Sequence, residues 1–217
     1  MSAAQIGRVG SPVASRLVDA NARAAATAVE PDAHLLIARA TDDPSGSVRA
    51  VALAALVRTA PRRVSAPIWR RSAHDADARV RLRSAEVAPK LGRAATCSVL
   101  VELLGDDDAW VAEAAAYAIG EHPRPSHVAI ASVTRVATTH ADPLVREAAV
   151  AALGAQGDPT GLPAVLAACD DKPAIRRRAV LALAAFEGDD VEARLRRALE
   201  DPDWQVRQAA EDLLAVT

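Results

Sequence analysis

Asp142-Pro143-Leu144-Val145-Arg146-Glu147-Ala148-Ala149-Val150-Ala151-Ala152-Leu153-Gly154 is the stretch that decides the fold. It predicts a turn that leads into a helix, because Asp142 suits an N-cap, Pro143 suits the first helical position and Gly154 suits the helix exit. The apolar residues Val145, Ala149, Ala152 and Leu153 follow the i, i+4, i+7, i+8 spacing of one helical stripe.

The same pattern recurs along the chain, which indicates a repeat protein. Each copy has an apolar residue followed by an arginine near the start of its second helix. These anchors are Val48-Arg49, Val80-Arg81, Val111-Ala112 (where the arginine is lost), Val145-Arg146, Ile175-Arg176 and Val206-Arg207. Six residues before the arginine position stands an aspartate in every copy except one, where His140 replaces it.

Each copy therefore predicts a helix, a short turn and a second helix. One such hairpin cannot bury its apolar stripe alone, whereas stacked hairpins can. We predict an all-α fold, an α-α superhelix (solenoid) of about seven helical-hairpin repeats. Residues 12–217 form this single domain, 12–30 being a degraded capping repeat, and 1–11 are a disordered N-terminal segment.

The recurrent aspartates and arginines have a structural interpretation. An aspartate in the turn can accept hydrogen bonds from the amides that open the second helix. The arginine can bridge to the aspartate of the same copy or of the next one, which would produce a ladder of charges along one edge. The alternative is that the arginines form a row that binds a ligand.

Composition narrows the class of protein. The 217 residues are 51% hydrophobic but only 2% aromatic, which suits thin layers of closely spaced helices. A net charge of -2 does not predict binding to nucleic acid or to a membrane surface. The distant Cys97 and Cys169 suit buried free thiols in a reducing cytosol, and neither a signal peptide nor a membrane span is apparent. We expect a cytoplasmic monomer.

The pattern Asp-x-x-x-x-Val-Arg-x-x-Ala-x-x-Ala-Leu-Gly resembles the short HEAT-like repeats named after phycobilisome lyase subunits (the E-Z type). The resemblance covers about residues 12–217. It implies a right-handed α-solenoid whose concave face usually binds other proteins, with enzymes in the minority.

Departures from the repeat concentrate in residues 106–140. Trp110 and Tyr117 stand near Ala112, which replaces the arginine, and His140 replaces the aspartate. The aromatic residues either fill a local packing gap or mark a concave binding surface. Charge is also divided here, since residues 62–93 carry a balance of +6 and residues 94–122 one of -6. The two blocks either attract each other across adjacent repeats or form a bipolar docking surface.

These observations favour a non-catalytic scaffold or adaptor that binds another protein on the concave face. The predicted partner-binding residues are Trp110, Tyr117, Arg81, Arg146 and Arg176. We expect no catalytic, cofactor or metal site, because the chain lacks His-Glu dipeptides, a phosphate loop and a nucleophile elbow.

The alternative is an enzyme that uses the central groove. One candidate is a HEAT-like DNA glycosylase, with Trp69, Trp110, Glu113 and Arg146 in the groove. The acidic block 94–122 would repel phosphates there, so we do not expect nucleic acid as a partner. The other candidate is a bilin lyase-type chromophore protein, which nothing beyond the repeat supports.

Overall fold

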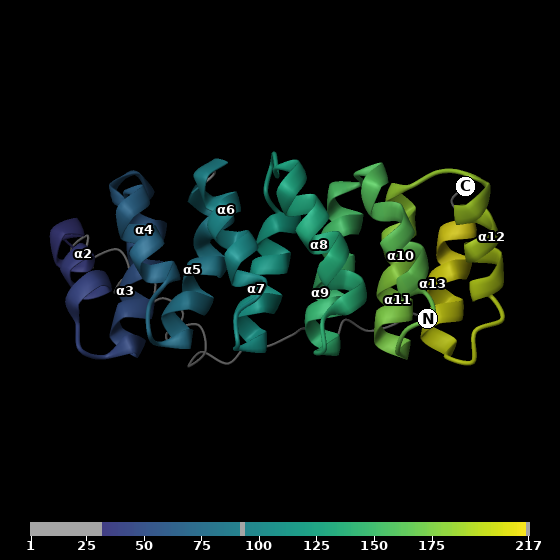
Figure 1. Ribbon diagram of the computed structural model, residues 1–217, viewed down its shortest axis with the longest axis horizontal. Coiled ribbons are helices and arrows are strands. Elements are labelled where there is room, and N and C mark those ends of the chain that lie inside the picture. The colour runs from purple at the N-terminus through teal and green to yellow at the C-terminus, as the bar shows by residue number, and fades with distance from the viewer. Residues whose placement is uncertain (1–31, 92–93, 216–217) are drawn as a thin grey trace, which may run out of the picture. The chain divides into compact units, whose positions relative to one another are not determined.

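The computed structural model describes residues 32–91 and 94–215. The predicted disordered segment 1–11 and the predicted capping repeat 12–30 lie outside the described residues. Within the described part there are twelve α-helices and three short 3-10 helices, with no strand. The helices form six hairpins that follow one another along the unit Ala33–Thr217 (Figure 1). The prediction of an all-α helical repeat solenoid is therefore confirmed.

Each hairpin consists of a first helix, here called A, and a second helix, called B. The A helices are α2 (Ala33–Asp42), α4 (Ala66–Ala73), α6 (Ala94–Leu103), α8 (His127–Thr139), α10 (Leu162–Ala168) and α12 (Asp189–Ala198). The B helices are α3 (Gly46–Thr59), α5 (Ala78–Leu91), α7 (Ala109–Gly120), α9 (Pro143–Gln156), α11 (Pro173–Ala182) and α13 (Trp204–Leu214). The 3-10 helices are η1 (Pro61–Arg63), η2 (Pro159–Gly161) and η3 (Leu183–Ala185).

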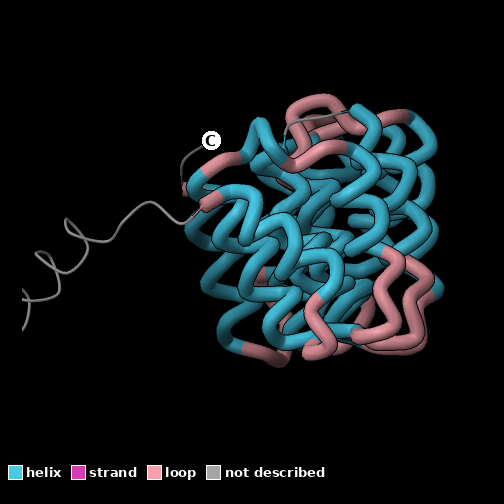
Figure 2. Tube along the Cα trace, turned by 90° about the vertical axis from the view of Figure 1, so that its left-hand side faces the viewer, coloured by secondary structure: helices cyan, strands magenta, loops and turns pink. Residues whose placement is uncertain are grey.

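Successive B helices pack on one another, and these contacts are more extensive than those between successive A helices. Figure 2, turned by 90°, shows this stack of helices joined by loops at both edges. The interfaces are filled mostly by alanine, valine and leucine, which explains how a chain with few aromatic residues forms a continuous core.

Helix α13 differs from the other B helices at one position of the stacking surface. Four residues after the arginine position, the first five B helices carry a buried apolar residue. These residues are Leu53, Ala85, Ala116, Val150 and Val180. In α13 the same position holds Glu211, which is exposed.

Gly154 does not end its helix as predicted, and that assignment is wrong. Helix α9 continues to Gln156 and is capped by Gly157, whose φ of 61° is in the left-handed region. Gly154 lies inside the helix, where a Cβ atom would be 2.7 Å from the Cβ of Ala182 on α11. The glycine is needed for helix spacing, and Gly120 of α7 approaches Ala152 of α9 in the same way.

Two smaller expectations can be checked in the described residues. Cys97 and Cys169 are both free and buried, as expected. None of the helices between residues 32 and 215 combines the length and the apolar content that crossing a lipid bilayer requires.

Candidate functional site

The repeated arginines fasten each turn to the next one. In α5, Nη1 of Arg81 donates to the backbone carbonyls of Asp75 (2.9 Å) and Ala76 (3.2 Å) in its own turn. Its Nε and Nη2 donate to the two carboxylate oxygens of Asp106 in the following turn, at 2.7 and 2.9 Å. Such bidentate, charge-assisted pairs are among the stronger side-chain interactions. The predicted bridge therefore runs to the next copy and not to the same one.

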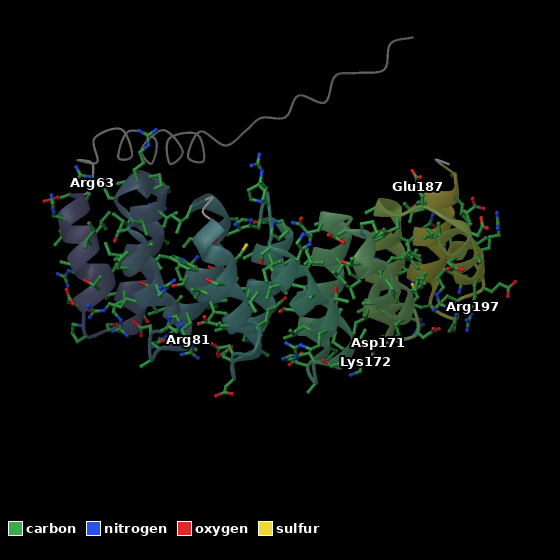
Figure 3. The ribbon with its side chains drawn as sticks, turned by 45° about the horizontal axis from the view of Figure 1, so that its top comes forward. Arg63, Arg81, Asp171, Lys172, Glu187 and Arg197 are labelled. Carbon is green, nitrogen blue, oxygen red and sulfur yellow. The ribbon has the colours of Figure 1, made fainter. Side chains whose placement is uncertain are left out.

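Four rungs of this kind make up the arginine ladder. They are Arg49–Asp75, Arg81–Asp106, Arg146–Asp171 and Arg176–Asp201. Figure 3 shows Arg81 and Asp171 along one edge of the stack, opposite the edge that holds Arg63 and Glu187. The hydrogen bond from the arginine lowers the pKa of Asp106, Asp171 and Asp201 below its usual value. The structural interpretation of the arginines is confirmed by these contacts.

Two details of the predicted turn were wrong. Arg146 pairs with Asp171 and not with Asp170, whose carboxylate accepts instead from Arg194 at 2.6 Å. The turn before α11 is also one residue shorter than the others. Arg176 donates to the carbonyl of Asp171, five positions before it, whereas Arg81 donates to the carbonyl of Asp75, six positions before it.

The predicted N-cap role of Asp142 is confirmed, whereas the recurrent aspartate six residues before the arginine position does not cap the second helix. Asp108 caps α7 by accepting from the Trp110 amide, and Asp142 caps α9 by accepting from the Leu144 amide. Asp106, the ladder residue, accepts from the Asp108 amide and so closes the turn.

One rung is absent between α7 and α9. Ala112 stands where the arginine would be and His140 stands where its carboxylate partner would be. Nδ1 of His140 accepts from the Asp142 amide at 3.1 Å, so the histidine keeps the turn-closing role without the bridge. At the opposite end of the same helices, Nε2 of Gln156 donates to the carbonyls of Ile119, Gly120 and His122 (3.0, 2.6 and 3.0 Å).

The helix that lacks the arginine carries two exposed aromatic side chains. Trp110 is 60% exposed and Tyr117 is 40% exposed. With Glu113 between them they follow the i, i+3, i+7 spacing of one stripe of α7, here called the aromatic face. The interpretation that the two aromatic residues fill a packing gap is wrong, because large parts of both face solvent.

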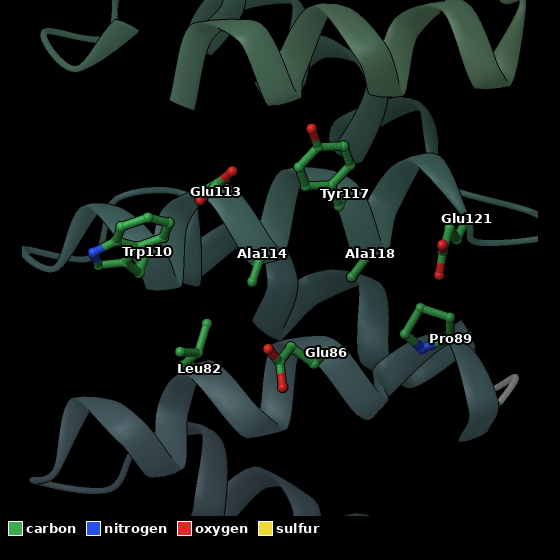
Figure 4. Close-up of a pocket in the computed structure, with 9 residues that line it drawn as sticks. All are labelled: Leu82, Glu86, Pro89, Trp110, Glu113, Ala114, Tyr117, Ala118 and Glu121. Carbon is green, nitrogen blue, oxygen red and sulfur yellow. The ribbon is translucent and has the colours of Figure 1, made fainter. Parts of the chain in front are cut away.

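The aromatic face borders a depression of about 410 Å³ between α5 and α7. Helix α5 contributes Leu82, Glu86 and Pro89, and the end of α7 contributes Glu121 (Figure 4). The residues from α5 were missed by the sequence analysis. Leu82 lies one position after Arg81, as Glu113 lies one position after Ala112. Glu86 and Tyr117 likewise lie five positions after Arg81 and Ala112. That equivalence was the available signal.

The depression is negatively charged. Burial raises the pKa of Glu113, and the carboxylates of Glu147 and Asp142 raise it further. Glu86 is paired with Arg83 at 2.6 Å, and Glu147 lies 3.5 Å from Arg178. Among the residues that the structure describes, Glu113 and Glu121 form no ion pair.

The five predicted partner-binding residues do not come together. Trp110 and Tyr117 share the aromatic face, whereas Arg81, Arg146 and Arg176 are engaged in the ladder with side chains only 14–20% exposed. The four residues considered for a glycosylase groove do not form one site either, because Arg146 is in the ladder and only Trp110 and Glu113 lie on the aromatic face. Trp69 is buried and its indole N–H donates to the carbonyl of Ser84 at 3.0 Å, so its ring is unavailable to a nucleobase.

Among the residues that the structure describes, no group of three or more histidine, cysteine, aspartate or glutamate side chains is arranged so that it could hold a metal ion. His122 is buried, and its Nδ1 accepts from the Arg124 amide at 3.2 Å in the loop before α8.

Solved structures share the fold at low sequence identity. Escherichia coli YibA matches with a TM-score of 0.65 and 21% identity, covering 85% of this chain and 68% of that one. A designed armadillo repeat protein in complex with the peptide (KR)4 matches with a TM-score of 0.62 and 16% identity over 85% and 98%. The complex of CpcE and CpcF of phycocyanin lyase from Nostoc sp. PCC7120 matches with 0.60 and 20% over 84% and 75%.

A search of curated proteins found no match. The family model described as HEAT repeats matches residues 33–120, 104–184 and 130–215, which together span nearly all of the described repeats. The chain therefore belongs to the HEAT-repeat family.

Proposed function

We propose that this chain is a non-catalytic scaffold that binds another protein at the aromatic face. The observation that carries the proposal is the exposure of Trp110 and Tyr117 on one stripe of α7, beside an open depression. Leaving large aromatic side chains in water forgoes the free energy that their burial would supply. Tryptophan and tyrosine are also the residues most often found at the energetic centre of protein interfaces.

The position of the aromatic face supports the same proposal. It lies on the B helices, whose more extensive mutual packing is expected of the inner layer of a curved stack. Inner surfaces of repeat proteins are extended and concave, which suits a bound chain. The ladder arginines then have an indirect role, since they fix the spacing of the repeats that present this surface.

The related structures are compatible with a binding role. The designed armadillo protein was solved with a peptide, and CpcE was solved with CpcF. We also propose that the repeats are of the phycobilisome-lyase type, which the sequence motif resembles. This assignment concerns the architecture of the repeat and not a lyase activity. No residue of the aromatic face points to attachment of a chromophore.

Site-specific photo-crosslinking in the native cell tests the proposal. A photoreactive phenylalanine analogue at Tyr117 should give a discrete crosslinked species that contains this chain and a second protein. The matched control places the same analogue at Val128 of α8, an A-helix residue that is 67% exposed. Identical products from both positions, or none from Tyr117, would show that the aromatic face is not the binding surface.

A further inference from the structure

We propose that the depression at the aromatic face receives the side chain of a lysine or arginine from an extended segment of the partner. The inference rests on the proposed function, because it names the chemistry of what the aromatic face binds.

The negative charge around the aromatic face is only partly compensated. Four glutamates surround the aromatic face, namely Glu86, Glu113, Glu121 and Glu147. Two of them have cations, Arg83 and Arg178, and Glu113 and Glu121 have none among the described residues. Glu113 lies between the two aromatic rings and is partly buried. A cation placed beside it would relieve the repulsion that Glu147 and Asp142 exert on its carboxylate.

The two rings flank the carboxylate of Glu113 along α7. Seven residues of α-helix place Trp110 and Tyr117 about 10 Å apart along α7, with Glu113 between them. Figure 4 shows the carboxylate of Glu113 on the stretch of helix that separates the rings. An ammonium or guanidinium group can therefore sit against a ring face while it pairs with the carboxylate. Cation–π contact and ion pairing favour the same charge at this position.

The equivalent positions of helix α9 in the neighbouring repeat carry different side chains. In α9, the positions of Trp110 and Tyr117 hold Leu144 and Ala151, and Arg146 is present. Helix α7 contains no basic residue along its whole length. The aromatic pair and the absence of helix-borne positive charge therefore coincide in a single repeat. The same charge disfavours a nucleic-acid occupant, because phosphates would face unpaired carboxylates.

A peptide-binding measurement on the full chain tests the inference. The probe is a short fluorescent peptide of alternating arginine and serine, compared with peptides of alternating glutamate and serine and of alternating glycine and serine. We expect anisotropy to rise only with the arginine peptide, and the affinity to fall as salt increases. Trp110→Ala and Glu113→Gln should each weaken binding by about 5- to 10-fold.

Two matched variants serve as controls. Trp204→Ala removes a tryptophan that is 64% exposed near the start of α13, and Glu187→Gln removes one exposed carboxylate at the other edge of the stack. Both should leave the affinity unchanged. If Glu187→Gln weakened binding as much as Glu113→Gln, bulk charge would explain the result and the site would be wrong.

The remaining outcomes separate this inference from the proposed function. No binding of the arginine peptide, or equal binding of the uncharged peptide, overturns the cationic occupant. The photo-crosslink at Tyr117 would still establish the surface in that case. A dimer of the free protein that Trp110→Ala dissociates would make a second copy the occupant and would also overturn the inference.

Discussion

Replacing Gly154 by alanine is a direct test of how the repeats are spaced. The added Cβ would lie 2.7 Å from the Cβ and 2.8 Å from the Cα of Ala182 on α11. Neither atom belongs to a flexible side chain, so contact can be relieved only by moving α9 and α11 apart. That movement would also disturb the buried side chains around Leu153 and Leu183.

The expected effect is the difference between two opposing terms. Overpacking a well-packed interface costs about 1–3 kcal/mol, and the rigid position of Ala182 places Gly154→Ala toward the upper end. Alanine in a helix interior is favoured over glycine by about 1 kcal/mol. The free energy of unfolding should therefore fall by about 1–2 kcal/mol.

Urea denaturation followed by far-ultraviolet circular dichroism measures this change. Gly105→Ala is the matched control, because its Cβ would meet only the Glu102 carbonyl oxygen at an ordinary 3.6 Å. That variant should be neutral or slightly stabilising. If Gly154→Ala were stabilising by about 1 kcal/mol, helix propensity alone would govern the position and the close approach of α9 and α11 would be refuted.

Three further predictions concern the ladder and the core. A double-mutant cycle of Arg176→Ala and Asp201→Ala should give a coupling energy of about 1–3 kcal/mol, because the paired side chains are only 16% and 11% exposed. Because the ladder arginines lower the pKa of Asp106, Asp171 and Asp201, the stabilisation from these pairs is present above the ordinary pKa of 3.8 and is lost as pH falls through the lower folded values. The urea midpoint should therefore fall as the solution is acidified below about pH 4. Trp69→Phe should lower the free energy of unfolding by about 1–2 kcal/mol, since it removes the buried bond to the Ser84 carbonyl.

Each of these has a control within the chain. The exposed pair Glu192–Arg196 should give a coupling of about 0.5 kcal/mol or less, and a similar value for the ladder pair would mean that the ladder is not stabilising. Removing a ladder arginine should flatten the acid dependence of the urea midpoint, and an unchanged profile would assign the dependence to other groups. Trp204→Phe should leave stability unchanged, so an equal loss at Trp204 and Trp69 would contradict the role of the buried indole.

The helical hairpins and their stacking could be predicted because their signals are local. The spacing of the apolar-arginine anchors and the proline at the start of α9 depend on only a few neighbouring residues. The role of Gly154 could not be predicted, because it depends on the distance between two helices that are separate in the sequence. The pairing of Arg146 with Asp171 was missed for a related reason, since a turn shorter by one residue moves the carboxylate that faces the arginine.

Exposure of the aromatic residues could have been predicted from the repeat itself. In α7 the buried residues Val111, Ala115 and Ile119 lie one before, three after and seven after the arginine position. Trp110 and Tyr117 lie two before and five after it, off that stripe. The packing-gap interpretation is wrong because neither ring lies on the buried stripe of α7.

The absent rung and the aromatic face are two aspects of one departure from the repeat. Both members of the rung are replaced, the arginine by Ala112 and the aspartate by His140. Replacing only one of them would have left an unpaired, partly buried charge in the ladder. The interface between α7 and α9 is held instead by Gln156 and by the close approach of Gly120 to Ala152. Helix α7 is therefore held in place although it lacks the ladder arginine and carries no basic residue. A rigid helix with exposed rings and an unpaired carboxylate is a preorganised surface for a cation, and it arises where the repeat could dispense with its arginine.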